Sequence, residues 1–471
     1  MLKMVLIVGF VLAFLGYAKY LIRINASIWY IPSVIISGIA CFMYMAGILN
    51  IMPLMVYIIL GFGIFLLLRN KEKIELSVNN TVIFSIVILG LCMWLIYYLR
   101  GALYADGDSM THWGRIIRSM VKDDRLPNFM NREIYCQAYP PASACWIYFI
   151  TYIFGFSERI AMFAQDSWIL LGAITLFGLN KLKGKKYILM NIIILFNVLL
   201  LFINSFDTLI VDILLASVTV TGLVVIADDE LSDRYRIYIL SVLFAILPMI
   251  KNSGFIFVVF LLLALVFVWE RKQNIKSIII LLSPSVTFFV LWNAHIKMVF
   301  AAANETRHSI GVNYMFNLFK SRDAEQLKTI SDAFVKKWFS NNISMEWEVW
   351  VALLVGLLVG GVLYKEKHKY LLKMLTYNIL IYLLYKIGMY GMYIFNMAGE
   401  DALRVAAYER YQWTFSLIMS FFITYVVALL LTENKAIIMS VGLFLIMPLL
   451  FFKIMPLDTF VRPDYENGGG T

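Results

Sequence analysis

The chain has 471 residues, of which 62% are hydrophobic and 15% charged, and its formal net charge is +10 at neutral pH. A soluble globular protein holds about 45–50% apolar and about 25% charged residues, so this composition excludes a soluble fold and predicts an all-α polytopic membrane protein. The Lys and Arg residues stand in short clusters between apolar runs. That distribution argues against nucleic acid as a partner and leaves the lipid bilayer as the surroundings of the chain.

Apolar segments follow one another along the whole chain. A helix needs about 20 predominantly apolar residues to cross the hydrocarbon core, and about fourteen segments are predicted to do so. They are residues 5–18, 29–49, 52–68, 81–98, 160–179, 187–203, 209–227, 237–250, 254–269, 277–300, 350–363, 371–394, 413–431 and 436–452.

Lys and Arg next to the span ends indicate sidedness, because positive residues are retained in the cytoplasm. Their clusters alternate consistently only if residues 144–156 do not cross. This short segment follows Tyr139-Pro140-Pro141, which breaks a helix entering it, so we predict a juxtamembrane or re-entrant helix. Transmembrane helices then occupy residues 1–99, 158–300 and 348–465. Large extracytoplasmic loops occupy 100–157 and 301–347, and 466–471 form a tail or linker.

The first large loop contains Asp106, Asp108, His112 and Arg115 within ten residues. If a helix begins near Asp108, then Asp108, His112 and Arg115 lie on one face, with Asp108 or Ser109 as the capping residue. One interpretation is a catalytic site. The other, of equal weight, is a capped amphipathic helix whose basic residues meet lipid headgroups.

Further charged residues stand at the predicted outer ends of later spans. Asp207 and Asp212 flank a tight turn, and Asp212 lies inside an apolar span, where an unpaired carboxylate is costly. Lys386 lies within a span and needs a partner or a water-filled cavity, whereas Lys251 is near enough to the interface to snorkel. A third predicted outer loop, residues 397–412, adds three candidates, namely Arg404, Glu409 and Arg410.

The sequence contains no nucleotide-binding loop, zinc-ligand pair or Ser-His-Asp pattern. Outer-side carboxylates beside outer-side cations suit a reaction on a lipid with an anionic headgroup. Arg and Lys would bind its phosphate, and a carboxylate would remove the proton of an acceptor hydroxyl. Because cytoplasmic nucleotide donors cannot reach this side, the activated group must arrive attached to a lipid.

The pattern Asp108…His112-Trp113-Gly114, followed by Tyr139-Pro140-Pro141, resembles the first extracellular loop of GT-C glycosyltransferases. It is most similar to the polyprenyl-phosphate-sugar-dependent members, such as the aminoarabinose transferases and protein mannosyltransferases. The resemblance covers residues 106–212 with recognisable motifs and the rest by topology. Two features depart from the family: Ser109 replaces the second acidic residue of the usual Asp-Glu pair, and extra spans precede the loop.

The resemblance implies an inverting transfer of a sugar from a polyprenyl-phosphate donor to an extracytoplasmic acceptor at the plasma membrane. The Met-, Ile- and Lys-rich, Pro-poor composition suggests a bacterial source. The acceptor would be a cell-wall polymer, a glycolipid or a protein. Asp108 would be the general base, with Asp106 or Asp207 supporting acceptor or metal binding. Dependence on a divalent cation, which Asp106 and Asp108 would hold, stays open. The other residues expected at the substrate are His112, Arg115, Tyr139, Asp212, Lys251, Lys386, Arg404, Glu409 and Arg410.

Two other functions remain open at the level of sequence. An O-antigen polymerase or ligase would use polyprenyl-diphosphate glycans and a catalytic late loop. A lipid-linked-sugar flippase or transporter would line a path with Asp166, Asp212 and Lys386. Transporters commonly carry internal repeats with broken spans, and no such repeat is evident.

Overall fold

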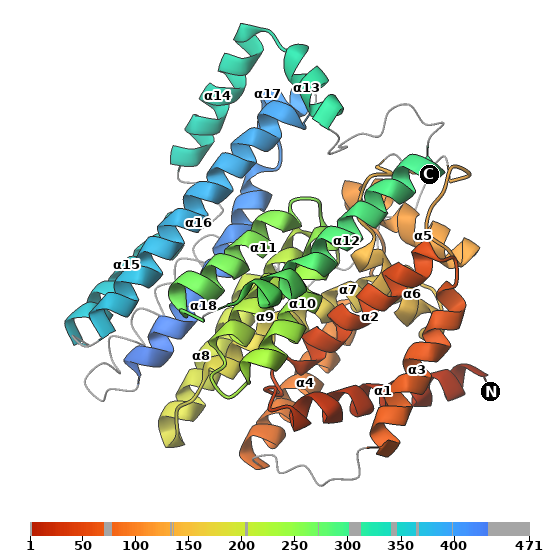
Figure 1. Ribbon diagram of the computed structural model, residues 1–471, viewed down its shortest axis with the longest axis vertical. Helices are drawn as coiled ribbons and strands as arrows, with labels where there is room; N and C mark the ends of the chain where they lie inside the picture. Colours follow the sequence, from red (N-terminus) through yellow and green to blue (C-terminus); the bar gives the residue numbers. More distant parts are fainter. Residues whose placement is uncertain are drawn as a thin grey trace.

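The computed structural model describes residues 2–69, 78–131, 134, 136–202, 206–271, 273–300, 312–340, 346–363, 367–397 and 399–431. Over these residues the secondary structure is helical, without a strand (Figure 1). The all-α prediction is therefore confirmed.

Eight helices are long and apolar enough to cross a membrane. They are α1 (Leu2–Arg23), α2 (Ile31–Ile48), α3 (Met52–Arg69), α4 (Val78–Tyr98), α7 (Glu158–Ala173) with its continuation η2 (Ile174–Leu179), α12 (Ile275–Val299), α16 (His368–Phe395) and α18 (Tyr408–Leu430). Such a set of helices is expected of an integral membrane protein.

The remaining helices are shorter or less apolar. The apolar ones are α6 (Ala142–Phe154), α8 (Gly184–Phe202), α9 (Asp212–Ala227), α10 (Asp233–Ile250), α11 (Gly254–Leu263) with η4 (Ala264–Val268), and α15 (Glu346–Leu363). The polar or short ones are η1 (Ser109–Trp113), α5 (Gly114–Asp123), α13 (Val312–Lys320), α14 (Ala324–Phe339) and α17 (Gly399–Leu403). Every predicted span up to residue 431 coincides with a helix, whereas 436–452 lies outside the described residues. The count of about fourteen crossings stays a prediction.

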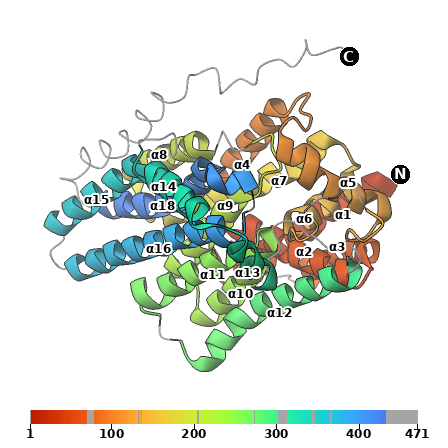
Figure 2. The same ribbon diagram turned by 90° about the horizontal axis from the view of Figure 1, so that it is seen from above.

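Helix α9 forms the centre of the bundle. It packs against α7, α10 and α18, and its residues from Asp212 to Ile226 are all buried. Seen from above, α15, α16 and α18 lie on one side of it and α1 and α3 on the other (Figure 2). Neighbouring helices approach closely, since a Cβ atom on Gly172 of α7 would meet the Ser217 side chain of α9 at 2.7 Å. Small residues at such contacts are typical of helix packing in membranes.

The predicted non-crossing segment, 144–156, corresponds to α6. Its 13 residues span about 20 Å, which is shorter than the hydrocarbon core of about 30 Å. All but Tyr152 and Phe154 are buried, and the helix packs against α2, α5 and α7. Its length and burial agree with a helix that packs on the protein instead of crossing the bilayer.

The predicted second loop, 301–347, contains α13 and α14, and α15 begins slightly before the predicted boundary at 348. Residues 301–311 and 341–345 lie outside the described part. The Arg322 guanidinium joins this hairpin to α16 through the backbone carbonyls of Tyr393 (2.5 Å), Ile394 (2.7 Å) and Met397. The carbonyls of Tyr393 and Ile394 lie in the last turn of α16 and have no intrahelical partners. A cation there satisfies these acceptors and also interacts favourably with the negative end of the helix dipole.

We expect Arg322→Gln to lower the free energy of unfolding by about 2 kcal/mol, since it removes charge-assisted hydrogen bonds to α16. Thermal unfolding of the detergent-solubilised protein measures this change. Lys320→Gln, at the exposed end of α13, is the matched control and should leave the midpoint unchanged. Equal shifts of the unfolding midpoint for the two variants would show that the hydrogen bonds of Arg322 to α16 do not stabilise the protein.

Candidate functional site

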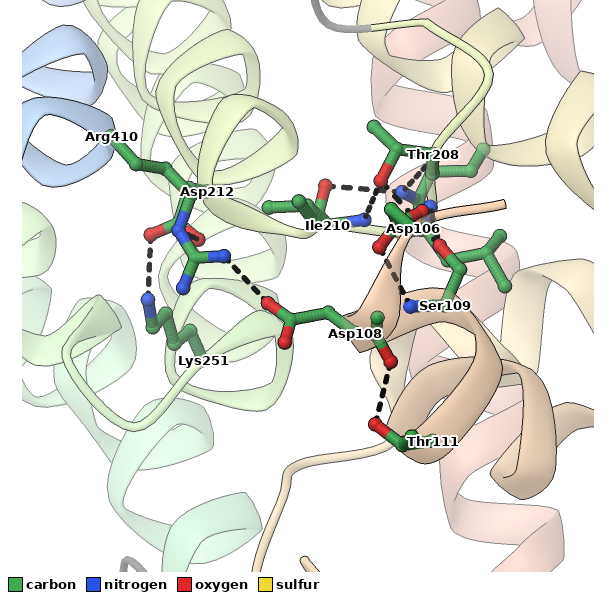
Figure 3. A network of polar contacts seen from close by, with 12 residues as sticks. Asp106, Asp108, Ser109, Thr111, Thr208, Ile210, Asp212, Lys251 and Arg410 are labelled. Carbon is green, nitrogen blue, oxygen red and sulfur yellow. Dashed lines mark hydrogen bonds and ion pairs between the residues drawn. The ribbon is translucent and has the colours of Figure 1, made fainter. Parts of the chain in front are cut away.

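Four charged residues of alternating sign, Asp108, Arg410, Asp212 and Lys251, follow one another in a row of ionic contacts (Figure 3). Nη1 of Arg410 donates to Oδ2 of Asp108 at 2.6 Å. Nε of Arg410 lies 3.5 Å from Oδ2 of Asp212, and Nζ of Lys251 donates to Oδ1 of Asp212 at 2.6 Å. Asp108 and Arg410 are 302 positions apart in the sequence, so the fold brings together segments that are remote along the chain.

The two ends of this row of charges differ in their exposure to solvent. The Asp108 and Arg410 side chains are 36% and 31% exposed, whereas Asp212 is 6% exposed. Nε of Arg410 is buried and makes no hydrogen bond among the described residues. Buried polar groups are normally paired. The unsatisfied Nε faces the buried Asp212, whereas the side chain as a whole is partly exposed next to the partly exposed carboxylate of Asp108.

Asp108 lies in the first turn of a helix whose cap differs from the predicted one. The prediction that Asp108 caps the helix is wrong, because its side chain makes no capping hydrogen bond. Asp106 does so instead, since its Oδ1 accepts from the Ser109 backbone at 2.8 Å. The two carboxylates consequently point to different partners, and Asp108 is left available to Arg410 (Figure 3).

The turn that follows Asp108 is a π-helical turn, η1. Such a turn adds one residue to the α-helical repeat, so the predicted common face of Asp108, His112 and Arg115 does not persist in the expected register. His112 instead packs edge-on against Tyr139, with ring centroids 5.9 Å apart, and Nε of Arg115 donates to the Met110 carbonyl at 3.3 Å.

Tyr139 packs near Asp108, against the rings of Trp113 and His112. It stacks on Trp113 at a centroid distance of 4.9 Å. Burial raises the pKa of Tyr139, and the nearby Asp108 adds to the increase. The phenol is therefore neutral at physiological pH. Nδ1 of His112 is buried without a hydrogen-bond partner among the described residues.

The connection between α8 and α9 carries Asp212 to the site and is held by side chains from two other segments. Oγ of Ser109 accepts from the Leu209 backbone at 2.8 Å. The Gln165 amide donates to the carbonyls of Thr208 and Ile210, each at 3.1 Å. Asp212 then begins α9, where the helix dipole favours a carboxylate. Asp207 adopts a left-handed conformation (φ 62°), and its backbone N–H donates to the Asp166 carboxylate. None of the ionic contacts that join the four charged residues involves Asp207.

Lys251 lies between α10 and α11, and its ammonium stands 4.4 Å from the centre of the Tyr411 ring. Its bond to Asp212 shows that it does not simply snorkel to the surface, the alternative left open by the sequence. Tyr411 follows Arg410 and contacts that guanidinium too, at 5.4 Å. The two cations and the aromatic ring thus form one cluster.

Three predicted residues do not join this cluster. Lys386 is 1% exposed and pairs with Glu346 at 2.9 Å. Glu409 accepts from Lys337 at 3.1 Å. Arg404 is 69% exposed and pairs with Asp401 at 2.6 Å, within its own helical turn. These three residues, expected at the substrate, are therefore not part of the arrangement around Asp108.

Several neighbours of the predicted residues are not found from the sequence. Glu346, the partner of Lys386, falls within the predicted loop 301–347. Gln165 and Tyr411 are common residue types in membrane helices and loops, and no spacing pattern marks them. A weak signal was present for Glu346 alone, because a lysine inside a span demands an acidic partner.

A divalent cation held by Asp106 and Asp108 was left open by the sequence. Oδ1 of Asp106 binds a backbone N–H, and Asp108 faces Arg410, so the two carboxylates as placed do not form a shared oxygen cage. Over the described part of the chain, no group of three or more His, Cys, Asp or Glu side chains is placed to hold a metal ion. We therefore derive no step through a metal.

For the sugar transfer that the resemblance implies, the geometry predicts that Arg404→Gln leaves the KM of the polyprenyl-phosphate sugar within about twofold of the wild-type value, because an exposed ion pair contributes little. Steady-state kinetics measures this constant. A large increase in KM would contradict the expectation that Arg404, unlike Arg410, lies away from the substrate.

In comparisons with protein families, curated proteins and solved structures, none matches this chain.

Proposed function

We propose that the chain is an integral membrane glycosyltransferase of GT-C type that moves a sugar from a polyprenyl-phosphate donor to an acceptor hydroxyl. The reaction takes place at the extracytoplasmic face of the plasma membrane. One observation carries the proposal: Asp108 and Arg410 meet at 2.6 Å, and both remain about one-third exposed. A general base and a phosphate-binding cation are thus adjacent and accessible.

In the proposed reaction the acceptor oxygen attacks the anomeric carbon from the face opposite the phosphate. The new bond joins the acceptor oxygen to that carbon, and the bond that breaks joins the carbon to the phosphate oxygen. Asp108 takes the proton of the acceptor hydroxyl, and the lipid phosphate leaves with the bonding electron pair. This balance gives an inverted sugar linkage and a polyprenyl phosphate.

Arg410 is the proposed ligand of the donor phosphate. Asp108, Asp212, Arg410 and Lys251 together carry no net charge when all four are ionised. Once Asp108 has accepted a proton, the cluster carries one net positive charge, which stabilises the phosphate that leaves. Electrostatic stabilisation of charge that develops in the transition state is a large contribution to catalysis.

Asp212 and Lys251 support this role indirectly. Asp212 is buried and bound to Lys251 at 2.6 Å, and its second oxygen lies 3.5 Å from Nε of Arg410. A guanidinium placed between two carboxylates is fixed in orientation, because its donors form a rigid planar fork. Arg410 therefore holds its position before the donor arrives.

The transporter alternative needs Asp166, Asp212 and Lys386 on a common path. Each of the three has a different partner: Asp166 accepts from the Asp207 backbone, Asp212 pairs with Lys251, and Lys386 pairs with Glu346. These separate contacts favour structural roles for Asp166 and Lys386.

The test is a transfer assay with the purified chain in nanodiscs, supplied with radiolabelled undecaprenyl-phosphate hexoses and a panel of glycan, glycolipid and peptide acceptors. We expect label to move to one acceptor class and undecaprenyl phosphate to be released. A parallel assay in sealed vesicles records movement of the labelled lipid between leaflets. Leaflet exchange without transfer would contradict the proposal and favour a flippase, and transfer only from diphosphate donors would favour a polymerase or ligase.

A further inference from the structure

The segment that carries Arg410 into the site has an unusual backbone. Val405 and Ala407 both adopt left-handed conformations, with φ values of 51° and 58°. This region is unfavourable for residues with a Cβ, and most of all for a β-branched residue such as valine. Such conformations persist only where surrounding contacts impose them.

Four polar side chains from α14 and α16 impose this conformation. On one side of the turn, the Tyr393 hydroxyl donates to the Ala406 carbonyl at 2.7 Å, and Lys337 donates to the Val405 carbonyl at 3.1 Å. On the other side, Lys386 donates to the Tyr408 hydroxyl at 2.5 Å, and the Tyr385 hydroxyl donates to the Tyr411 carbonyl at 2.6 Å. Arg410 therefore lies between two anchored residues.

Lys386 is the one of these anchors that is a buried charge. Its ammonium is 1% exposed, pairs with Glu346, which is 5% exposed, and lies 4.8 Å from the centre of the Tyr408 ring. Tyr382 donates a further hydrogen bond to Glu346. Replacing a buried ion pair by apolar residues is often neutral or stabilising, so such a pair is weak evidence for a stabilising role. The Lys386–Glu346 pair is therefore better explained by a role in positioning neighbouring residues.

We propose that Lys386, held by Glu346, is a positioning residue that acts through Tyr408 to fix the start of α18, so that the Arg410 guanidinium reaches Asp108. Its effect on the donor rests on the proposed function, whereas its effect on the Arg410–Asp108 contact does not. Lys386 itself does not touch the donor, because its ammonium is enclosed by Glu346 and Tyr408.

The geometric part is tested by thermal unfolding of a mutant series. In the wild-type background, Asp108→Asn and Arg410→Gln each break the same ion pair, so their shifts in Tm should not add. Tyr408→Phe removes the hydroxyl that Lys386 binds and keeps the ring. In that background we expect the two shifts to add. Non-additivity of unchanged size would overturn the proposal.

Tyr377→Phe is the matched control. Tyr377 is also a buried tyrosine of α16, and its hydroxyl donates to the Phe260 carbonyl at 2.9 Å, away from the start of α18. The variant should lower Tm while leaving the non-additivity intact, and loss of non-additivity in this control would also overturn the proposal. If Tyr408→Phe does not fold, the pair Lys386→Met with Glu346→Gln serves, because it removes both buried charges together.

The functional part is read from kinetics. Tyr408→Phe should lower kcat/KM for the donor about tenfold, less than Arg410→Gln does, since it misplaces the guanidinium that stabilises the leaving phosphate without removing the base. Unchanged kcat/KM in Tyr408→Phe, or an equal loss in Tyr377→Phe, would overturn the positioning role. If wild-type protein transfers no sugar while Tyr408→Phe still abolishes the non-additivity, the positioning role stands and the proposed function falls.

Discussion

Asp108→Asn should reduce the rate of sugar transfer by about a hundredfold to ten-thousandfold, the usual contribution of a general base. Asparagine has nearly the shape of aspartate but cannot accept the proton of the acceptor hydroxyl. In the proposed mechanism Arg410 binds the donor phosphate, so binding of a polyprenyl phosphate should persist. Single-turnover transfer measures the rate, and equilibrium binding of undecaprenyl phosphate measures the affinity.

Asp106→Asn is the matched control for this variant. Asp106 stands only two positions away, yet its carboxylate caps the helix turn through the Ser109 backbone. Asparagine caps helices about as well as aspartate. Turnover should therefore stay within about threefold of wild type. Full turnover in Asp108→Asn, or an equal loss in Asp106→Asn, would remove Asp108 as the base.

Arg410→Gln should lower kcat/KM for the sugar donor by about a hundredfold to a thousandfold. In the proposed mechanism the substitution removes the guanidinium that stabilises the leaving phosphate. Arg410→Lys should recover only a small part of this loss. Lysine keeps the charge, but it lacks the planar fork that contacts Asp108 and Asp212 together. Steady-state kinetics at varied donor concentration separates the effects on KM and on kcat.

Arg404→Gln provides the control for Arg410, since it removes an arginine from the same stretch of sequence whose side chain is exposed. A second arm uses Lys251→Gln, which should show a smaller loss than Arg410→Gln because Lys251 acts through the buried Asp212. Equal kinetics for Arg410→Gln and the wild-type protein would contradict the assignment of the donor phosphate to this residue.

Much of the helical architecture follows directly from composition. Each predicted span within the described residues is a helix because the backbone of a buried or lipid-facing segment must satisfy its own hydrogen bonds. The behaviour of α6 also follows, since Pro140 and Pro141 end the preceding stretch and only a short apolar segment remains. Of the residues expected at the substrate, the structure places Asp108, Asp212, Lys251 and Arg410 in contact. It gives other partners to Lys386, Arg404 and Glu409.

Pairings across the sequence could not be obtained in this way. Arg404 and Arg410 were equal candidates, and only the start of α18 at Tyr408 directs one toward Asp108 and leaves the other outside. Asp106 and Asp108 were likewise alternatives until the capping bond separated them. Lys386 required a partner, but the choice of Glu346 depends on how α15 and α16 pack. Each of these distinctions is set by tertiary contacts, which a single sequence does not encode in local patterns.

The most direct test of the account is a structure of the full chain in nanodiscs with an undecaprenyl-phosphate sugar bound. We predict that the phosphate contacts the Arg410 guanidinium and that the anomeric carbon faces the Asp108 carboxylate, with Lys386 still paired to Glu346. A phosphate bound at Arg404 or Lys386, with the Asp108–Arg410 contact undisturbed and remote from the sugar, would contradict it.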